Sequence, residues 1–153
     1  MRIVVGGDRA GYSLKTAMIP LIESLGHQVV DIGCGPGEDL YFPIAAKKLC
    51  ALILSGEAER GIMFCGTGVG ASIACNKIPG IRASIVHDIQ CAHQSVEHDH
   101  VQVMCIGEKC VGAWHAWDLI QAFLVAEGET NERVRLMIKM LGEMDGSGSV
   151  VPD

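Results

Sequence analysis

The sequence lacks long hydrophobic runs: 49% of its residues are hydrophobic, yet no run approaches the ~20 residues of a membrane-spanning helix. No cleavable signal precedes the first strand-like segment. Basic residues are also scarce, since 12 Lys and Arg stand against 18 Asp and Glu without a basic stripe. We therefore expect a soluble, cytoplasmic protein with neither a membrane nor a nucleic acid among its partners.

No pair of cysteines has the C-x-x-C spacing, and their total of seven is odd. A disulfide framework or a zinc ribbon is therefore not expected, and the cysteines fit a reducing compartment. We expect six of them to be small residues of the core, namely Cys34, Cys50, Cys75, Cys91, Cys105 and Cys110. The seventh, Cys65, is set apart by the sequence around it.

At 153 residues the chain is long enough for one domain with a substantial core. Short β-branched runs alternate with helical patterns, which predicts an α/β fold with a parallel sheet. The expected strands are 2–7, 27–33, 60–66, 81–87 and 101–107, and the expected helices are 11–26, 43–56, 70–77, 88–98, 111–126 and 131–144. Asp88 is the predicted N-cap of its helix. We place the domain at 1–144 and expect a disordered tail at 145–153.

Five such strands suggest a single-domain, Rossmann-like, doubly wound sheet with the strand order 2-1-3-4-5. Strands 1 and 3 are then neighbours at the point where the winding reverses, which is where such sheets bind ligands. The loop GDRAG after strand 1 faces the loop CGTGVG after strand 3. We therefore expect Asp8, Arg9, Cys65 and Thr67 to converge at this edge of the sheet.

Cys65 ends its strand and is followed by glycines and by the start of a helix, whose first amide groups have no internal partner. Such a position favours anions, including a thiolate that serves as base or nucleophile near neutral pH. The alternative is one more core cysteine. The loop is not G-x-G-x-x-G, so no nucleotide cofactor is expected, and its amides suit a phosphate, a carboxylate or an enediolate oxyanion. Thr67 adds a hydroxyl or serves as a local backbone partner.

The stretch EHDH at 97–100 offers two histidines beside two carboxylates. They can carry protons or, with Cys91 and His93, bind a metal; no standard zinc spacing is present, so no metal is expected. His98 precedes the last strand and so lies at the opposite edge of the sheet from Cys65. If both act in one site, a second subunit must bring the histidine, which predicts a homodimer.

Three segments carry a resemblance: GGDRAGYSLK, GEAERGIMFCGTGVGASIACNKIPGIRASIVHD and VEHDHVQVMCIGEKCVG. They resemble the type B ribose-5-phosphate isomerases and the related galactose-6-phosphate isomerase subunits. The resemblance implies a Rossmann-like fold and a cofactor-free aldose–ketose isomerase of a sugar phosphate, in carbohydrate metabolism such as the pentose phosphate pathway. It also implies a homodimer or homotetramer with sites at the dimer interface and a C-terminal helix used in dimerisation.

The resemblance also implies roles for individual residues. Cys65 is similar to the base that moves a proton between two substrate carbons. Asp8 and His98 are similar to the groups that open the sugar ring, with His98 as proton donor, and Asp99 stands where the family has a substrate-binding Asn. The cradle for the enediolate oxygens is implied to be Gly66, Thr67, Gly68, Val69 and Gly70.

The chain departs from the family pattern where the far end of the substrate is held. Arg9 replaces a histidine, Phe42 replaces a tyrosine, and Lys109 replaces an arginine. The phosphate-binding segment, rich in arginine in the family, reads ETNERVRLM and keeps Arg133 and Arg135. Arg9, Lys109 and one of these two can together rebuild an anion site.

Three functions remain open from the sequence. The first is an isomerase, with ribose 5-phosphate and ribulose 5-phosphate as the default pair and a tetrose or hexose phosphate as the variant. The second is a sugar-phosphate-binding subunit without catalysis. The third, a thiol redox protein, ranks last because no resolving cysteine lies near Cys65 in the sequence.

Overall fold

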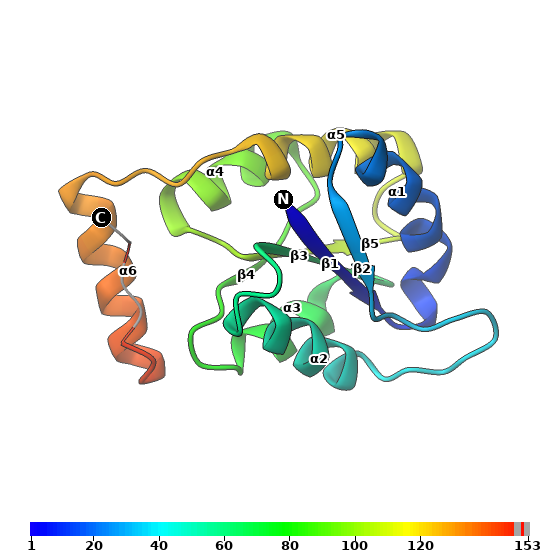
Figure 1. Ribbon diagram of the computed structural model, residues 1–153, viewed down its shortest axis with the longest axis horizontal. Coiled ribbons are helices and arrows are strands. Elements are labelled where there is room, and N and C mark those ends of the chain that lie inside the picture. The colour runs from blue at the N-terminus through cyan, green and yellow to red at the C-terminus, as the bar shows by residue number, and fades with distance from the viewer. Residues whose placement is uncertain (149–150, 152–153) are drawn as a thin grey trace.

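The computed structural model describes residues 1–148 and residue 151 (Figure 1). Its strands are β1 (Arg2–Gly7), β2 (Gln28–Asp31), β3 (Arg60–Cys65), β4 (Ala83–Ile85) and β5 (Val103–Gly107). Its helices are the 3-10 turn η1 (Arg9–Gly11) and α1 (Tyr12–Ser24), α2 (Phe42–Leu54), α3 (Val69–Asn76), α4 (Ile89–Asp99), α5 (Ala113–Val125) and α6 (Glu132–Asp145). Every predicted element is present. Within the described residues, no helix is long and apolar enough to cross a membrane.

The five strands form one parallel sheet with helices on both faces, which confirms the predicted α/β class. Neighbouring side chains along a strand point to opposite faces. Ile62 and Phe64 of β3 lie in the core beneath α1, α4 and α5, whereas Met63 and Cys65 lie in the core against α2 and α3. Figure 1 shows α1, α4 and α5 on one side of the sheet and α2 and α3 on the other.

The strand order is β2-β1-β3-β5-β4, so the predicted order 2-1-3-4-5 is wrong for the last two strands. β5 is buried along its whole length, whereas the three residues of β4 are half-buried. A strand that is apolar on both faces is most stable between two neighbours, and a short strand is tolerated at an edge. Because β5 rather than β4 is the neighbour of β3, the carboxyl ends of β5 and β3 lie side by side, and Gly107 pairs with Cys65.

The cysteines divide into a buried and an exposed set. Cys34, Cys50, Cys75 and Cys105 are buried, as expected, but the expectation is wrong for Cys91 and Cys110, which are exposed. Cys91 lies in the first turn of α4, which faces solvent there, and Cys110 lies in the turn after β5. The predicted N-cap of α4 is confirmed, because a carboxylate oxygen of Asp88 accepts the amide hydrogen of Cys91 at 2.7 Å.

α6 packs on α4 and lies at the far end of the molecule from α1 (Figure 1). Its buried side chains face α4 and the end of the described chain, where Val151 packs against Val134 and Ile138. Its other face leaves four large apolar side chains exposed: Leu136, Met140, Leu141 and Met144. Of the tail predicted to be disordered, residues 149, 150, 152 and 153 lie outside the described residues, and the domain boundary stays a prediction.

Candidate active site

Cys65 and Asp8 meet at the carboxyl edge of the sheet, as predicted. The Cys65 Sγ donates a hydrogen bond to Oδ2 of Asp8 at 3.2 Å. The other oxygen of Asp8, Oδ1, accepts the amide hydrogen of Ala10 at 2.9 Å and caps the turn η1. Because one oxygen is fixed by the backbone, the second is held toward the sulfur. Cys65 is 8% exposed, so its sulfur lies at the floor of this edge rather than deep in the core.

Glycines let the first loop lie directly against the third strand. A Cβ on Gly11 would stand 2.4 Å from the backbone nitrogen of Cys65, and one on Gly7 would stand 2.5 Å from the carbonyl oxygen of Phe64. Contacts this short do not occur, so any side chain at these positions would push the loop away from β3. The glycines of GDRAG therefore set the distance between Asp8 and Cys65.

The loop after Cys65 presents backbone amides. Gly68 has a φ of 80°, which turns the chain into α3. Among the described residues, no backbone hydrogen bond outside the helices and strands takes the amides of Gly66, Thr67 or Gly68 as donors. The Thr67 hydroxyl accepts the amide hydrogen of Val69 at 3.4 Å, so it acts as a local backbone partner. Free amides before a helix start form a concave site for an anion.

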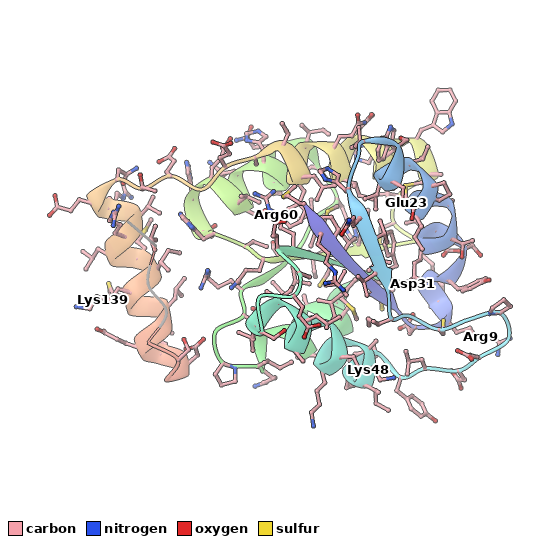
Figure 2. The ribbon with its side chains drawn as sticks, in the orientation of Figure 1. Arg9, Glu23, Asp31, Lys48, Arg60 and Lys139 are labelled. Atoms are coloured by element: carbon pink, nitrogen blue, oxygen red, sulfur yellow. The ribbon has the colours of Figure 1, made fainter. Side chains whose placement is uncertain are left out.

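Lys109 lies over the same loop because β5 neighbours β3. Its amide donates to the carbonyl oxygen of Gly66 at 3.0 Å, and its side-chain Cε is 3.9 Å from where a Cβ on Gly66 would stand. Arg9 is exposed on the turn η1, at this end of the molecule (Figure 2). The Phe42 ring lies against α3, 2.9 Å from where a Cβ on Gly70 would stand. Asp8, Arg9, Cys65, residues 66–70 and Lys109 together form what we call the carboxyl-edge cluster.

His98 and Arg133 lie at the other edge of the sheet. They line a hollow of about 300 Å³ with Glu129, Asn131 and Met137, between the end of α4 and the start of α6. His98 Nε2 is 3.6 Å from Oε1 of Glu129. We call these residues, together with Asp99, the amino-edge cluster. The six residues of β3, which ends at Cys65, span about 16 Å at ~3.3 Å per residue, so the two ends of the sheet are well separated. In Figure 2, Arg9 and Lys139 of α6 mark these opposite ends.

The remaining candidates at the amino edge differ in what they contact. Asp99, which is exposed, accepts a hydrogen bond from Nε of Arg82 through its backbone carbonyl at 2.9 Å. Arg135 Nε donates to the carbonyl oxygen of Thr130 at 2.8 Å and so holds the start of α6, whereas Arg133 is the arginine in the hollow beside His98. Within the described residues, no group of three or more His, Cys, Asp or Glu is arranged to hold a metal ion.

Two residues beside the carboxyl-edge cluster were missed by sequence analysis. Glu108 Oε2 accepts the amide hydrogen of Leu14 at 2.9 Å and ties the end of β5 to α1. His87 Nε2 accepts the amide hydrogen of Gly107 at 3.0 Å. The sequence did show a histidine at the end of the predicted strand 81–87. Its contact with Gly107 was not predicted, because the position of β5 in the predicted strand order was wrong.

Cys34 cannot resolve a Cys65 disulfide in this fold. Its amide donates to the carbonyl oxygen of Gly7 at 3.2 Å, so it lies on the far side of β1 from Cys65. Two strand spacings of ~4.8 Å put the two Cα atoms roughly 10 Å apart, beyond the ~7 Å limit for a disulfide. This geometry excludes Cys34 as a resolving cysteine for Cys65.

A doubly wound parallel sheet with a thiol, a carboxylate and free amides at its carboxyl edge is the arrangement typical of an α/β enzyme that acts on a small anion. Comparison with known proteins gives the family. Residues 3–141 match the family model described as Ribose/Galactose Isomerase. The chain belongs to the ribose/galactose isomerase family, and the predicted membership is confirmed.

Individual relatives agree with this assignment. The D-erythrulose-4-phosphate isomerase 2 of Mycolicibacterium smegmatis is 38% identical over 83% of this chain and 86% of its own. The ribose-5-phosphate isomerase B of Escherichia coli is 34% identical over 84% of this chain and 86% of its own. A solved structure of Clostridium thermocellum ribose-5-phosphate isomerase B superposes with a TM-score of 0.92 at 36% identity, over 97% of this chain and 100% of that one.

Proposed function

We propose that this isomerase interconverts the aldose and ketose forms of a phosphorylated sugar, with Cys65 as the base that moves the proton. The observation that supports this most is the meeting of a thiol, a fixed carboxylate and unpaired amides within one loop pair. The chain is a sugar-phosphate isomerase by family. The acting residues and the particular sugar are the proposal.

The reaction needs one base and one anion site. The Cys65 thiolate removes the proton from C2 of the open-chain aldose, and the carbonyl oxygen on C1 takes the negative charge of the enediolate. The same sulfur returns the proton to C1, while the O2 proton moves to O1, so the atoms balance. The amides of Gly66, Thr67 and Gly68 are the proposed donors to this developing charge, and a donor of this kind is worth roughly 3–4 kcal/mol in the transition state. No cofactor takes part.

Ring opening precedes this step, because sugar phosphates are cyclic in water. Asp8 accepts the proton of the anomeric hydroxyl, and a protonated histidine donates to the ring oxygen. His98 is proposed for this role. It does not reach Cys65 within one chain, so it must come from a second copy of the chain.

Two features support a homodimer in which the amino-edge cluster of one copy completes the carboxyl-edge cluster of the other. The exposed apolar side chains of α6 form a surface of the kind that is usually buried against another protein chain. A hollow of about 630 Å³ between α2 and α3 is lined by apolar residues such as Ile73 and Ile78, and it reaches Phe42, whose ring packs on Gly70 of the loop. With α6 of a second copy in this hollow, His98, Asp99 and Arg133 of that copy would approach Cys65.

Mixing two inactive variants tests the shared site. We expect Cys65→Ala and His98→Ala homodimers to be inactive alone and to regain about a quarter of wild-type activity after mixing and subunit exchange, because half the dimers then carry one native site. Cys65→Ala mixed with Asp8→Ala is the matched control and recovers nothing, because both residues belong to the same half-site. No recovery in the first mixture after verified exchange would contradict the shared site.

Ribose 5-phosphate and ribulose 5-phosphate are the default substrate pair. A tetrose phosphate is the second candidate, because Lys109 places a cation close to the Cys65 loop on the same chain and Arg9 adds an exposed cation on η1, which suits a shorter sugar. Values of kcat/KM for tetrose, pentose and hexose phosphates decide between them. Binding of a sugar phosphate without turnover of any would favour the non-catalytic subunit instead.

A further inference from the structure

His87 contacts the end of β5 beside the carboxyl-edge cluster. It lies two residues after the end of β4, and its Nε2 accepts the amide hydrogen of Gly107 at 3.0 Å. Since Nε2 is the acceptor, the proton of the neutral ring is on Nδ1. The ring therefore ties the edge strand to the last residue of β5.

Gly107, the last residue of β5, lies directly against the catalytic loop. It pairs with Cys65 across the sheet, and a Cβ on it would stand 2.6 Å from Cα of Thr67. The next two amides, of Glu108 and Lys109, donate to the carbonyl oxygens of Cys65 and Gly66 at 2.9 and 3.0 Å. A shift at Gly107 therefore moves the backbone that carries Cys65 and its loop.

We propose that His87 is a positioning residue of the isomerase, which fixes Gly107 so that the end of β5 supports the Cys65 loop. The proposal rests on the proposed function, since it assigns the residue to that same site. His87 does not touch the reacting atoms. It acts through one hydrogen bond that only the neutral imidazole can accept.

The surroundings of His87 keep the imidazole neutral. Burial lowers the pKa of His87, His115 lowers it further, and the neighbouring carboxylate of Asp88 opposes this. His115, from α5, donates its Nε2 hydrogen to the carbonyl oxygen of His87 at 3.0 Å. Asp88 is engaged by the amide of Cys91. These are the titratable groups that face the ring, and on protonation Nε2 becomes a donor that opposes the amide of Gly107.

Two substitutions separate the hydrogen bond from the space that the ring fills. His87→Ala removes the acceptor, and we expect kcat to fall about tenfold, with a smaller change in KM. His87→Gln places a side-chain oxygen near the position of Nε2, and we expect kcat to return to within roughly threefold of wild type. His93→Gln is the matched control, because His93 is half-buried on α4 and contacts Glu97 at 2.9 Å, away from the site.

The slope of kcat/KM against pH distinguishes this role from a merely structural one, because a histidine that only fills space would not change that slope. As the pH falls through the lowered pKa of His87, kcat/KM of the wild type should drop more steeply than protonation of one base requires, because His87 becomes charged and releases Gly107. In His87→Gln this additional drop should vanish, and in His93→Gln it should remain. A wild-type profile with the slope of one proton throughout, or the same steep slope in His87→Gln, would overturn the proposal.

Hydrogen exchange at the Gly107 amide tests the same bond without any activity. We expect this amide to be protected in the wild type and in His87→Gln, and to exchange at least tenfold faster in His87→Ala while neighbouring strand amides stay protected. Equal protection in all three would contradict the proposal. If instead no sugar phosphate were turned over by the wild type while Gly107 behaved as expected, the proposed function would fail and the contact would stand.

Discussion

Substitution of Gly107 by alanine tests whether the end of β5 sets the position of the catalytic loop. The added Cβ would lie 2.6 Å from Cα and 2.7 Å from the carbonyl carbon of Thr67, both of which are backbone atoms. Ordinary contact begins near 3.4 Å, so the loop must retreat from β5 by about 0.8 Å. A misplacement of this order costs roughly 30- to 100-fold in kcat, and the overpacking costs about 1–3 kcal/mol of unfolding free energy.

The assay is kcat and KM on the best sugar phosphate, together with thermal unfolding of each variant. Gly112→Ala is the matched control, since nothing lies within 4 Å of a Cβ at that position and it caps the next helix of the same segment. We expect its kcat to stay within roughly twofold of wild type, because it alters helix capping rather than the site. A folded Gly107→Ala enzyme with kcat within about threefold of wild type would refute the reasoning.

Three further predictions concern stability and thiol chemistry. Lys15 is 2% exposed and pairs with Asp31. Asp31→Asn leaves this buried cation without its partner and should lower the free energy of unfolding, measured with urea, by about 2 kcal/mol, whereas Lys15→Met removes the buried charge and should cost less. A larger loss in Lys15→Met than in Asp31→Asn would contradict the pairing. Cys91 and Cys110 are exposed, so each should give a fast phase with an aromatic disulfide reagent, and the corresponding Cys-to-Ser variant should remove that phase, whereas the buried Cys34, Cys50, Cys75 and Cys105 should react only on unfolding. Hydrogen bonds from Cys91 lower the pKa of Asp88, so its stabilisation is complete above about pH 4 and is lost as the pH falls through the lowered pKa. The urea midpoint between pH 5 and 3 should fall less steeply in Asp88→Asn, and an unchanged pH dependence would count against this.

The sequence predicted the elements well because local signals agreed with the fold. Buried strands such as RIVVGG and RGIMFC are apolar on both faces, and the amphipathic helices between them could pack only on a parallel sheet. The approach of Asp8 to Cys65 followed from one topological rule, that the first and third strands are neighbours at the switch point.

The order of the last two strands was not readable in the same way, because it depends on relative burial. The segments around β4 and β5 look alike as short apolar runs, and only packing decides that β5 takes the inner place. The consequences reach the site, since Lys109 and His87 take their positions from that exchange. The exposure of Cys91 and Cys110 was missed for a related reason, because a cysteine carries no sign of which face it occupies.

The most direct test of the account is hydrogen exchange between water and the sugar phosphate at the carbon beside the carbonyl. In deuterium oxide the wild-type enzyme should place deuterium on C1 or C2 of its substrate, as seen by NMR, and Cys65→Ala should incorporate less than about one hundredth as much while it still binds the sugar. Incorporation by a folded Cys65→Ala enzyme at a rate close to wild type would contradict the role given to this sulfur.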